Sequence, residues 1–221
     1  MMRRSVIRNS RVPLLPLWAA MAFAILTCNL LFGDDARGEK QKVILALGDS
    51  LTAGLGVVEA ESYPSLLQES LKARGYTHRV INAGVSGDTT AGGLARISWL
   101  LQQNPQVVIV ALGANDGLRG LPLPQMQANL KAIILKCRES RAHVLLAGMR
   151  IPPNYGEEYS REFEAVYAHL AAELHLPFVP FLLEGVAANR EYTQPDGIHP
   201  LGPGYRIVAQ TVWKHLQPLL D

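Results

Sequence analysis

The sequence predicts an α/β fold in which a five-stranded parallel sheet is covered by helices on both faces. Short apolar runs alternate along the 221-residue chain with longer segments in which apolar residues recur at helical spacing. Continuous apolar runs are typical of parallel strands, because both faces of such strands are buried. Repeated strand-then-helix order with short connections favours one sheet with helices on either side. The length and the 48% hydrophobic content suit a single domain with its own core.

The five predicted strands are short segments rich in apolar and β-branched residues. The first three are followed by polar, glycine-containing loops at Ser50, Gly84–Asp88 and Gly113–Asp116. In chain order the five strands are Val43–Leu47, Arg79–Ala83, Val107–Leu112, His143–Met149 and Pro177–Val179.

Five helices are predicted between and after these strands from the spacing of their apolar residues. The first ends at Gly75, a residue that commonly stops a helix. Cys137 shares the apolar face of the third helix, so we expect it to be a buried structural thiol. The helices are Ser62–Arg74, Thr90–Gln103 with Leu94, Ile97 and Leu101 on one face, Leu123–Arg138 with Met126, Leu130, Ile133 and Cys137, Tyr159–Leu174 with Phe163, Val166, Leu170 and Leu174, and Pro203–Leu216 with Ile207, Val208, Thr211 and Val212.

Residues 1–36 are predicted to be an N-terminal signal peptide or membrane anchor, followed by a linker at 37–42 and the folded domain at 43–221. Four arginines precede an apolar run from Leu14 to Phe32, the order found in export signals. Cleavage, retention as an anchor and lipidation at Cys28 all remain open, as does a start codon assigned too far upstream. We expect an exported protein, periplasmic or envelope-associated in a bacterium.

Charge outside this leader is balanced. Removing the four arginines and two aspartates of residues 1–36 from the 21 basic and 19 acidic side chains of the whole chain leaves 17 of each. A domain with no excess positive charge is a poor candidate for nucleic-acid binding. Only two cysteines are present and no Cys-x-x-Cys pattern occurs, so no metal site is predicted.

A serine directly follows the first predicted strand, in Gly48-Asp49-Ser50-Leu51, and Asp196-Gly197-Ile198-His199 lies near the C-terminus. A serine hydroxyl is a weak nucleophile until a base removes its proton. The base in turn needs a carboxylate that orients and stabilises its ring. These residues predict a catalytic triad in which Ser50 is the nucleophile, His199 the base and Asp196 the orienting acid.

Donors for the oxyanion of an acyl-transfer intermediate are expected beside Ser50. The carboxyl ends of parallel strands meet at one edge of a sheet, so Gly84–Asp88 and Gly113–Asp116 should lie next to Ser50. The backbone N–H of Ser50, the backbone N–H of Gly87 and the side-chain amide of Asn115 are the candidate donors. Taken singly, Gly87 and Asn115 also suit ordinary turns.

The four blocks around Ser50, Gly87, Asn115 and Asp196–His199 occur in the order found in the SGNH (GDSL) hydrolases, and from Val43 onward the chain resembles that family. The resemblance implies a three-layer α/β/α, flavodoxin-like fold and an oxyanion hole formed by Ser50, Gly87 and Asn115. Within the family the chain is similar to the bacterial acyl-CoA thioesterase I, lysophospholipase L1 and arylesterase group. The segments that carry this similarity are Ser86-Gly87-Asp88-Thr89, Asn115-Asp116-Gly117-Leu118-Arg119-Gly120 and Pro153-Asn154-Tyr155-Gly156.

The predicted function is a serine esterase that hydrolyses carboxylic esters and thioesters through an acyl-enzyme, with no cofactor. Small acyl esters, thioesters and lysophospholipids are the expected substrates, and no protein partner is implied. A carbohydrate O-acetylesterase on the same fold is the alternative, and a non-catalytic ligand-binding relative is a more distant one. Export would favour envelope esters over acyl-CoA, because acyl-CoA is cytosolic.

The segment Ile151–Gly156 follows the fourth predicted strand, and we expect it to wall the acyl site with Tyr155 or Pro153 as substrate-binding residues. Asp49 and Asp116 are expected to bond the backbone of their loops rather than to react. Arg119 suits either an anionic group of the substrate or an ordinary surface position.

Overall fold

The computed structural model describes residues 41–220. The predicted leader, Cys28 and most of the predicted linker lie outside this range, so those predictions stay predictions. Within the described range, no helix combines the length and the apolar character needed to cross a membrane.

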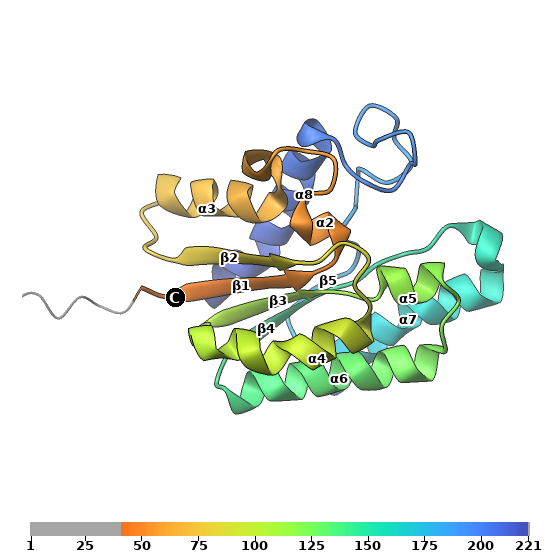
Figure 1. Cartoon of the computed structure of the whole chain (residues 1–221), viewed down its shortest axis with the longest axis horizontal. Coiled ribbons are helices and arrows are strands. Elements are labelled where there is room, and N and C mark those ends of the chain that lie inside the picture. The colour runs from red at the N-terminus through yellow and green to blue at the C-terminus, as the bar shows by residue number, and fades with distance from the viewer. Residues whose placement is uncertain (1–40, 221) are drawn as a thin grey trace, which may run out of the picture. The chain divides into compact units, whose positions relative to one another are not determined.

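The sheet has five parallel strands in the order β2-β1-β3-β4-β5 (Figure 1). This confirms the predicted fold class, and the order is that of flavodoxin-like sheets. The observed strands end within two residues of the predicted ones. β5 is short because Pro177 and Pro180 flank it and proline has no N–H for the ladder. The strands are β1 (Val43–Gly48), β2 (Arg79–Gly84), β3 (Val107–Ala111), β4 (His143–Ala147) and β5 (Phe178–Val179).

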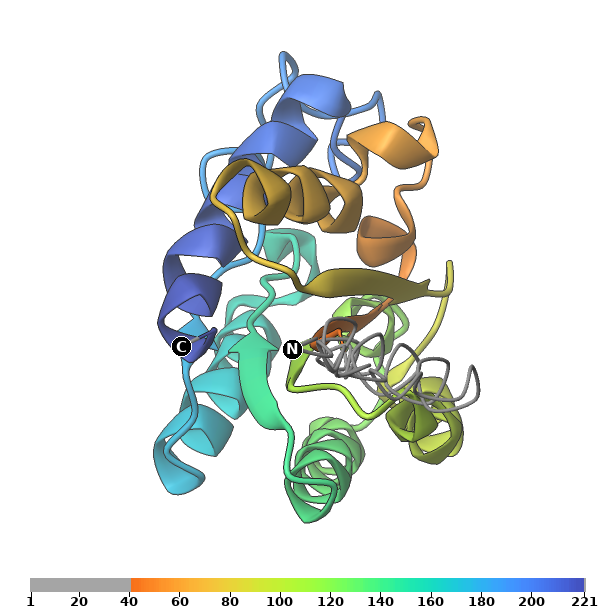
Figure 2. The same ribbon diagram turned by 90° about the vertical axis from the view of Figure 1, so that its left-hand side faces the viewer.

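Helices cover both faces of this sheet and complete a three-layer α/β/α sandwich (Figures 1 and 2). One layer holds α3 (Tyr63–Ala73) and α8 (Gly202–Leu216), and the opposite layer holds α4 (Thr90–Leu100), α6 (Leu123–Glu139) and α7 (Glu157–Glu173). Burial of their apolar faces against fully buried strands β1 and β3 forms one continuous core.

The helix faces follow the predicted periodicity in part, since the predicted face residues Leu174, Ile207 and Thr211 are only half-buried. All four predicted core residues of α6 are buried, including Cys137, and burial raises the pKa of the Cys137 thiol to about 12. In α4 the buried stripe runs through Gly93, Ile97 and Leu100 rather than the predicted leucines, which are half-buried. The absence of a side chain at Gly93 allows close packing there, because a Cβ would lie 2.2 Å from a methyl carbon of Leu112.

Two short helices at the carboxyl edge of the sheet were not predicted. They are α2 (Ser50–Ala53), which follows β1, and α5 (Ala114–Leu118), which follows β3. Helices of four or five residues are too short to show a 3.6-residue period in the sequence. Single 3₁₀ turns occur at η1 (Glu59–Glu61), η2 (Leu101–Gln103), η3 (Pro153–Tyr155) and η4 (Gln217–Leu219).

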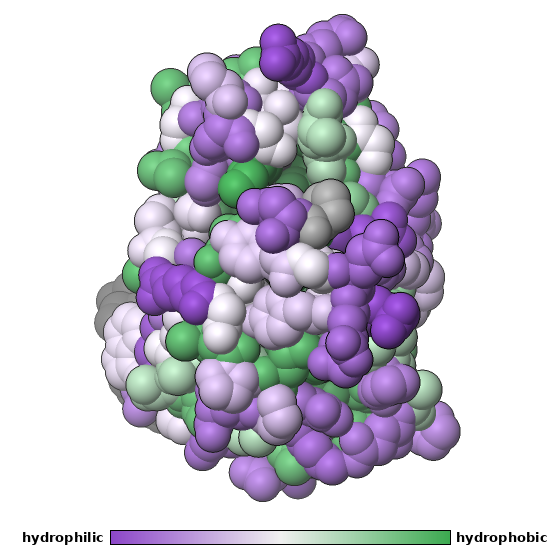
Figure 3. Space-filling view, turned by 90° about the vertical axis from the view of Figure 1, so that its right-hand side faces the viewer, coloured by the Kyte–Doolittle hydropathy of each residue, from purple (hydrophilic) through white to green (hydrophobic). Residues whose placement is uncertain are grey.

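The neighbouring strands β1 and β3 lead to opposite helix layers, so the sheet has its topological switch point between them. Ligands of open α/β sheets bind at the carboxyl ends of strands at such a point. Gly48 pairs with Gly84 of β2 on one side and with Ala111 of β3 on the other, which brings the three following loops together. Figure 3 views this side of the molecule, where hydrophobic atoms reach the surface between polar ones.

Candidate active site

The turn from β1 into α2 places Ser50 at the start of a helix. The carboxylate of Asp49 caps this helix by accepting the N–H of Leu51 at 3.0 Å. A Cβ at Gly48 would lie only 1.9 Å from the hydroxyl oxygen of Thr52, so glycine is required for the chain to turn this tightly. Ser50 is therefore presented at the switch point by a rigid, locally determined turn.

The three residues of the predicted triad are brought together. The Oγ atom of Ser50 lies 2.8 Å from Nε2 of His199, and Nδ1 of the same ring lies 2.6 Å from Oδ2 of Asp196. With Nδ1–H donating to the carboxylate, Nε2 is free to accept the proton of the serine hydroxyl. The geometry is that of a nucleophile, a base and an orienting acid connected in series.

Asp196 also organises its own loop. Its Oδ1 atom accepts the backbone N–H groups of Ile198 at 2.9 Å and His199 at 3.0 Å. Partial burial acts to raise the pKa of Asp196, but the hydrogen bonds from the His199 ring and from these two N–H groups outweigh it and lower the pKa below its ordinary value. The carboxylate stays ionised and ready to stabilise a protonated His199.

Gly87 lies in a tight turn after β2. The N–H of Asp88 donates to the carbonyl of Val85 at 3.0 Å, and Gly87 has a φ of 80°. A positive φ at the third position is the mark of a type II turn and strongly favours glycine. We call residues 85–88 the oxyanion turn, after the role predicted for Gly87.

Asn115, in the first turn of α5, contacts the two other loops. Its Nδ2 atom donates to the backbone carbonyl of Asp88 at 3.0 Å and to Oδ2 of Asp49 at 3.3 Å. The three loops predicted to surround Ser50 are thus linked through one amide group.

Asp49 bonds the backbone of its own turn, as predicted, whereas the Asp116 carboxylate bonds Thr90 at the start of α4 and not its own loop. Burial raises the pKa of Asp49 to about 6, against the opposing effects of the Leu51 N–H and the charge of His199. Asp116 accepts the hydroxyl of Thr90 at 2.6 Å and the N–H of Thr90 at 2.8 Å, both in the protein interior. Asp116 therefore fastens α5, and with it Asn115, to the start of α4.

A largely apolar cavity of 310 Å³ opens between the Asn115 and His199 loops. Its lining includes Ala114, the neighbour of Asn115, and Ile198, the neighbour of His199. Leu118 of α5 also lines it, and the other residues come from the segments after β4 and β5. The full lining is Ala114, Leu118, Met149, Arg150, Ile151, Pro152, Phe181, Leu183, Ala187, Ala188, Gly197 and Ile198.

The segment after β4 contributes to this wall differently from the prediction. Ile151 and Pro152 line the cavity, whereas Tyr155 does not. The Tyr155 hydroxyl instead donates to the backbone carbonyl of Leu118 at 2.9 Å, so this residue braces a lining helix from outside. Pro153 begins η3, and its side chain lies outside the described part of the structure.

The sequence interpretation missed the opposite wall, which residues 181–188 provide. These residues include an apolar run, Phe181-Leu182-Leu183, but have no clear strand or helix period. This apolar run follows the last predicted strand and belongs to no predicted helix or strand, so it was the one sign in the sequence that this segment lines a cavity.

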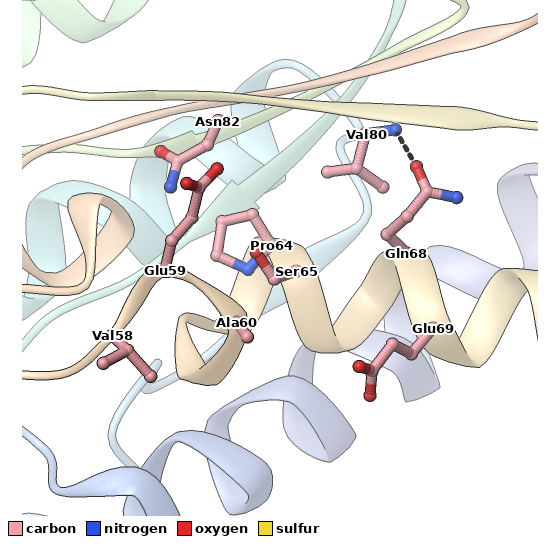
Figure 4. Close-up of a pocket in the computed structure, with 9 residues that line it drawn as sticks. All are labelled: Val58, Glu59, Ala60, Pro64, Ser65, Gln68, Glu69, Val80 and Asn82. Atoms are coloured by element: carbon pink, nitrogen blue, oxygen red, sulfur yellow. Dashed lines mark hydrogen bonds between the residues drawn. The ribbon is translucent and has the colours of Figure 1, made fainter.

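A second hollow of 680 Å³ lies where η1 and α3 meet the edge strand β2 (Figure 4). Glu59 and Asn82 point toward one another there, and Gln68 accepts the N–H of Val80 at 2.8 Å. Gln68 also donates to the carbonyl of His78, so its amide pairs with the free edge of β2 much as a strand would. The lining residues of this hollow come from outside the loops that surround Ser50.

Comparison with known proteins identifies the family. Residues 46–207 match the model of the GDSL-like lipase/acylhydrolase family. The chain belongs to this family. The match spans most of the chain and contains all four sequence blocks, which confirms the resemblance.

Named relatives of this GDSL-family hydrolase are esterases and thioesterases. An arylesterase of Vibrio mimicus is 41% identical over 87% of this chain and 98% of its own length. Thioesterase 1/protease 1/lysophospholipase L1 of Escherichia coli K12 is 39% identical over 84% of this chain and 88% of its own. The crystal structure of TesA is 44% identical, covers 81% of this chain and all of the TesA chain, and superposes with a TM-score of 0.79.

Proposed function

We propose that this GDSL-family hydrolase cleaves carboxylic esters and thioesters of hydrocarbon acyl groups through Ser50, His199 and Asp196. The observation that carries the proposal is the continuous hydrogen-bonded series from Ser50 Oγ through the His199 ring to Asp196. Such a series activates a hydroxyl that is otherwise a weak nucleophile.

In the first half-reaction, His199 Nε2 removes the Ser50 proton as Oγ attacks the carbonyl carbon. Asp196 stabilises the imidazolium that forms. When the tetrahedral intermediate collapses, the bond to the leaving oxygen or sulfur breaks, and His199 gives its proton to that atom. Water, deprotonated by His199, then attacks the acyl-enzyme, and the proton returns to Ser50 Oγ as the acid leaves.

The intermediate's oxyanion is assigned to the N–H groups of Ser50 and Gly87 and to the amide of Asn115. The bond from Asn115 to Asp49 is the longer of its two, at 3.3 Å, so that N–H is the one to be redirected to an oxyanion. The bond to the Asp88 carbonyl then keeps the amide in place. Each such donor contributes about 3 kcal/mol to transition-state stabilisation.

The 310 Å³ cavity is assigned to the acyl chain. Its lining is mostly aliphatic and aromatic, which favours a hydrocarbon chain over a sugar hydroxyl surface. At about 30 Å³ for each water-sized group, the cavity has room for roughly ten methylene groups. We therefore expect medium acyl chains to be preferred over acetyl, in contrast to a carbohydrate O-acetylesterase.

The leaving group is expected to vary, since the curated relatives carry the names arylesterase and thioesterase/lysophospholipase. The arginine-rich start and the apolar run of residues 14–32 support export, with the leader as a signal or an envelope anchor. In that compartment lysophospholipids and other envelope esters are the accessible substrates.

The test is hydrolysis of p-nitrophenyl esters from C2 to C16, with lysophosphatidylcholine and palmitoyl-CoA alongside and Ser50→Ala as the control. The expected result is a maximum at medium chain length and loss of activity in Ser50→Ala. Retained activity in Ser50→Ala would contradict the serine mechanism, and a strict preference for acetyl would favour the O-acetylesterase.

A further inference from the structure

Arg96 of α4 makes three hydrogen bonds to three segments around the site. Its Nε donates to Oδ2 of Asp88 at 2.8 Å, one terminal nitrogen to the carbonyl of Ala83 at 2.7 Å, and the other to the carbonyl of Gly48 at 3.0 Å. These acceptors lie in the oxyanion turn, in β2 and at the end of β1. A planar guanidinium can bond three fixed acceptors at once, which a lysine ammonium on a flexible stem does less well.

The ion pair between Arg96 and Asp88 is shielded from water. The Arg96 side chain is 22% exposed and the Asp88 side chain 11% exposed. Charge-assisted hydrogen bonds are stronger in such surroundings than between exposed partners, because solvent screens them less. The contact is therefore strong enough to define where Asp88 sits.

Asp88 connects the two loop-borne oxyanion donors, in addition to a hydrogen bond from Arg119, at the end of α5, to the carbonyl of Gly87. It follows Gly87 directly, its N–H closes the oxyanion turn, and its carbonyl accepts the Asn115 amide. A shift of Asp88 would therefore move the Gly87 N–H and release the Asn115 amide together. Sub-ångström errors in such donors are costly, because catalysis depends on their fixed geometry.

The helix under Asp88 is shaped to receive its carboxylate. A Cβ at Gly92, in the first half of α4, would lie 1.8 Å from Oδ1 of Asp88. Any side chain at Gly92 would displace the carboxylate from Arg96. A glycine inside a helix costs about 0.5–1 kcal/mol relative to alanine, so helix stability does not explain a glycine at this position.

We propose that Arg96 is a positioning residue for the oxyanion hole, holding the Gly87 N–H and the Asn115 amide in place through Asp88 seated over Gly92. This inference rests on the proposed function, in which Gly87 and Asn115 bind the oxyanion. Arg96 does not touch the substrate. Its effect should appear in the transition state and not in ground-state binding.

The test uses Arg96→Met, Arg96→Lys and Gly92→Ala, with kcat and KM measured on a p-nitrophenyl ester. We expect kcat to fall about tenfold to a hundredfold in Arg96→Met, less than the roughly 10²–10³ typical of removing a donor outright. Arg96→Lys should recover part of this loss. KM should change less than about threefold.

Gly92→Ala separates positioning from folding. Alanine favours the helix by about 0.5–1 kcal/mol, which offsets part of the cost of displacing Asp88, so the variant should stay folded while kcat falls as in Arg96→Met. Arg74→Gln is the matched control, because that arginine is exposed directly after the C-terminal end of α3 and bonds the carbonyl of Ser70, outside the oxyanion turn. It should leave kcat unchanged.

A second readout distinguishes the oxyanion hole from general structure. An alkyl boronic acid forms a tetrahedral adduct with the serine, and its inhibition constant should rise by the factor by which kcat falls. The inhibition constant of the product carboxylic acid, a ground-state ligand, should stay constant.

Unchanged kcat in Arg96→Met, or equal weakening of the boronic and carboxylic acids, would overturn the role of Arg96. Failure of the proposed function would be recognised by a different result, namely retained activity in Ser50→Ala.

Discussion

The two sides of Ser50 are built in different ways. On one side the oxyanion turn, α5 and the start of α4 are joined by hydrogen bonds among buried or half-buried polar groups, including Asp116, Asn115 and Arg96. On the other side the acyl cavity is walled by apolar side chains from irregular segments, braced by Tyr155 and by an exposed pair of Arg150 with Glu164. Directional bonds fix donor positions closely, whereas an apolar wall tolerates substitution if its volume is kept. The polar side should therefore determine rate, and the apolar side should determine chain length.

The largest expected effect is a loss of kcat when the Asn115 amide is removed from the polar side. Asn115→Ala should lower kcat by about 10²–10³ with little change in KM, because a donor to the oxyanion is lost. Steady-state kinetics on p-nitrophenyl butyrate would measure it. Asn154→Ala, an exposed position in η3, is the control. Equal kcat values for the two variants would show that Asn115 does not bind the oxyanion.

A smaller effect is expected on stability at Asp49. Its pKa in the folded protein is about 6, above the ordinary 3.8, so the unfolded chain loses this proton first. The ionised carboxylate therefore costs stability, and the free energy of unfolding should fall as pH rises from about 4 to about 6. The shift corresponds to about 3 kcal/mol.

In Asp49→Asn the pH-dependent loss of unfolding free energy that comes from ionising Asp49 is absent. Urea unfolding of the variant and the wild type at pH 4, 5, 6 and 7 should show a difference that grows in favour of the variant up to pH 6 and is constant above it. A difference that does not vary with pH would contradict the raised pKa of Asp49.

The smallest effect tests the apolar side. Ala187 lines the acyl cavity and is exposed, so Ala187→Trp should shorten the cavity without disturbing the core. The ratio of kcat/KM for octanoyl over acetyl esters should fall about tenfold, since each methylene in an apolar pocket contributes about 1–3 kcal/mol. Ala172→Trp, on the exposed face of α7, should leave the ratio unchanged. An unaltered ratio in Ala187→Trp would place the acyl chain elsewhere.

The difference between the polar and the apolar side of Ser50 also explains which parts of the site could be predicted from the sequence. The polar side lies at the ends of β1, β2 and β3, each an apolar run with a definite carboxyl end, so its loops could be placed together before the structure. Ser50, Gly87 and Asn115 were found in this way, and the triad partners Asp196 and His199 through a short motif.

The apolar side could not be predicted to the same extent. Between β4 and α8 only α7 has a clear period, and β5 contains two residues. Segments without a period leave side-chain direction undetermined, which is why Tyr155 was expected in the cavity that Ile151 and Pro152 line. Arg96 was also missed, because hydrogen bonds to two backbone carbonyls and one carboxylate leave no pattern in a sequence.

The nucleophile and its base lie 149 residues apart in the chain, although their atoms are 2.8 Å apart in the fold. Ser50 belongs to the first turn after β1, while His199 is delivered only when β5 and α8 have joined the sheet and its helix layer. A chain still emerging from the ribosome, or one that has lost its C-terminal segment, holds a serine with no base. Hydrolysis of a chromogenic ester is thus a direct report that synthesis and folding have both been completed.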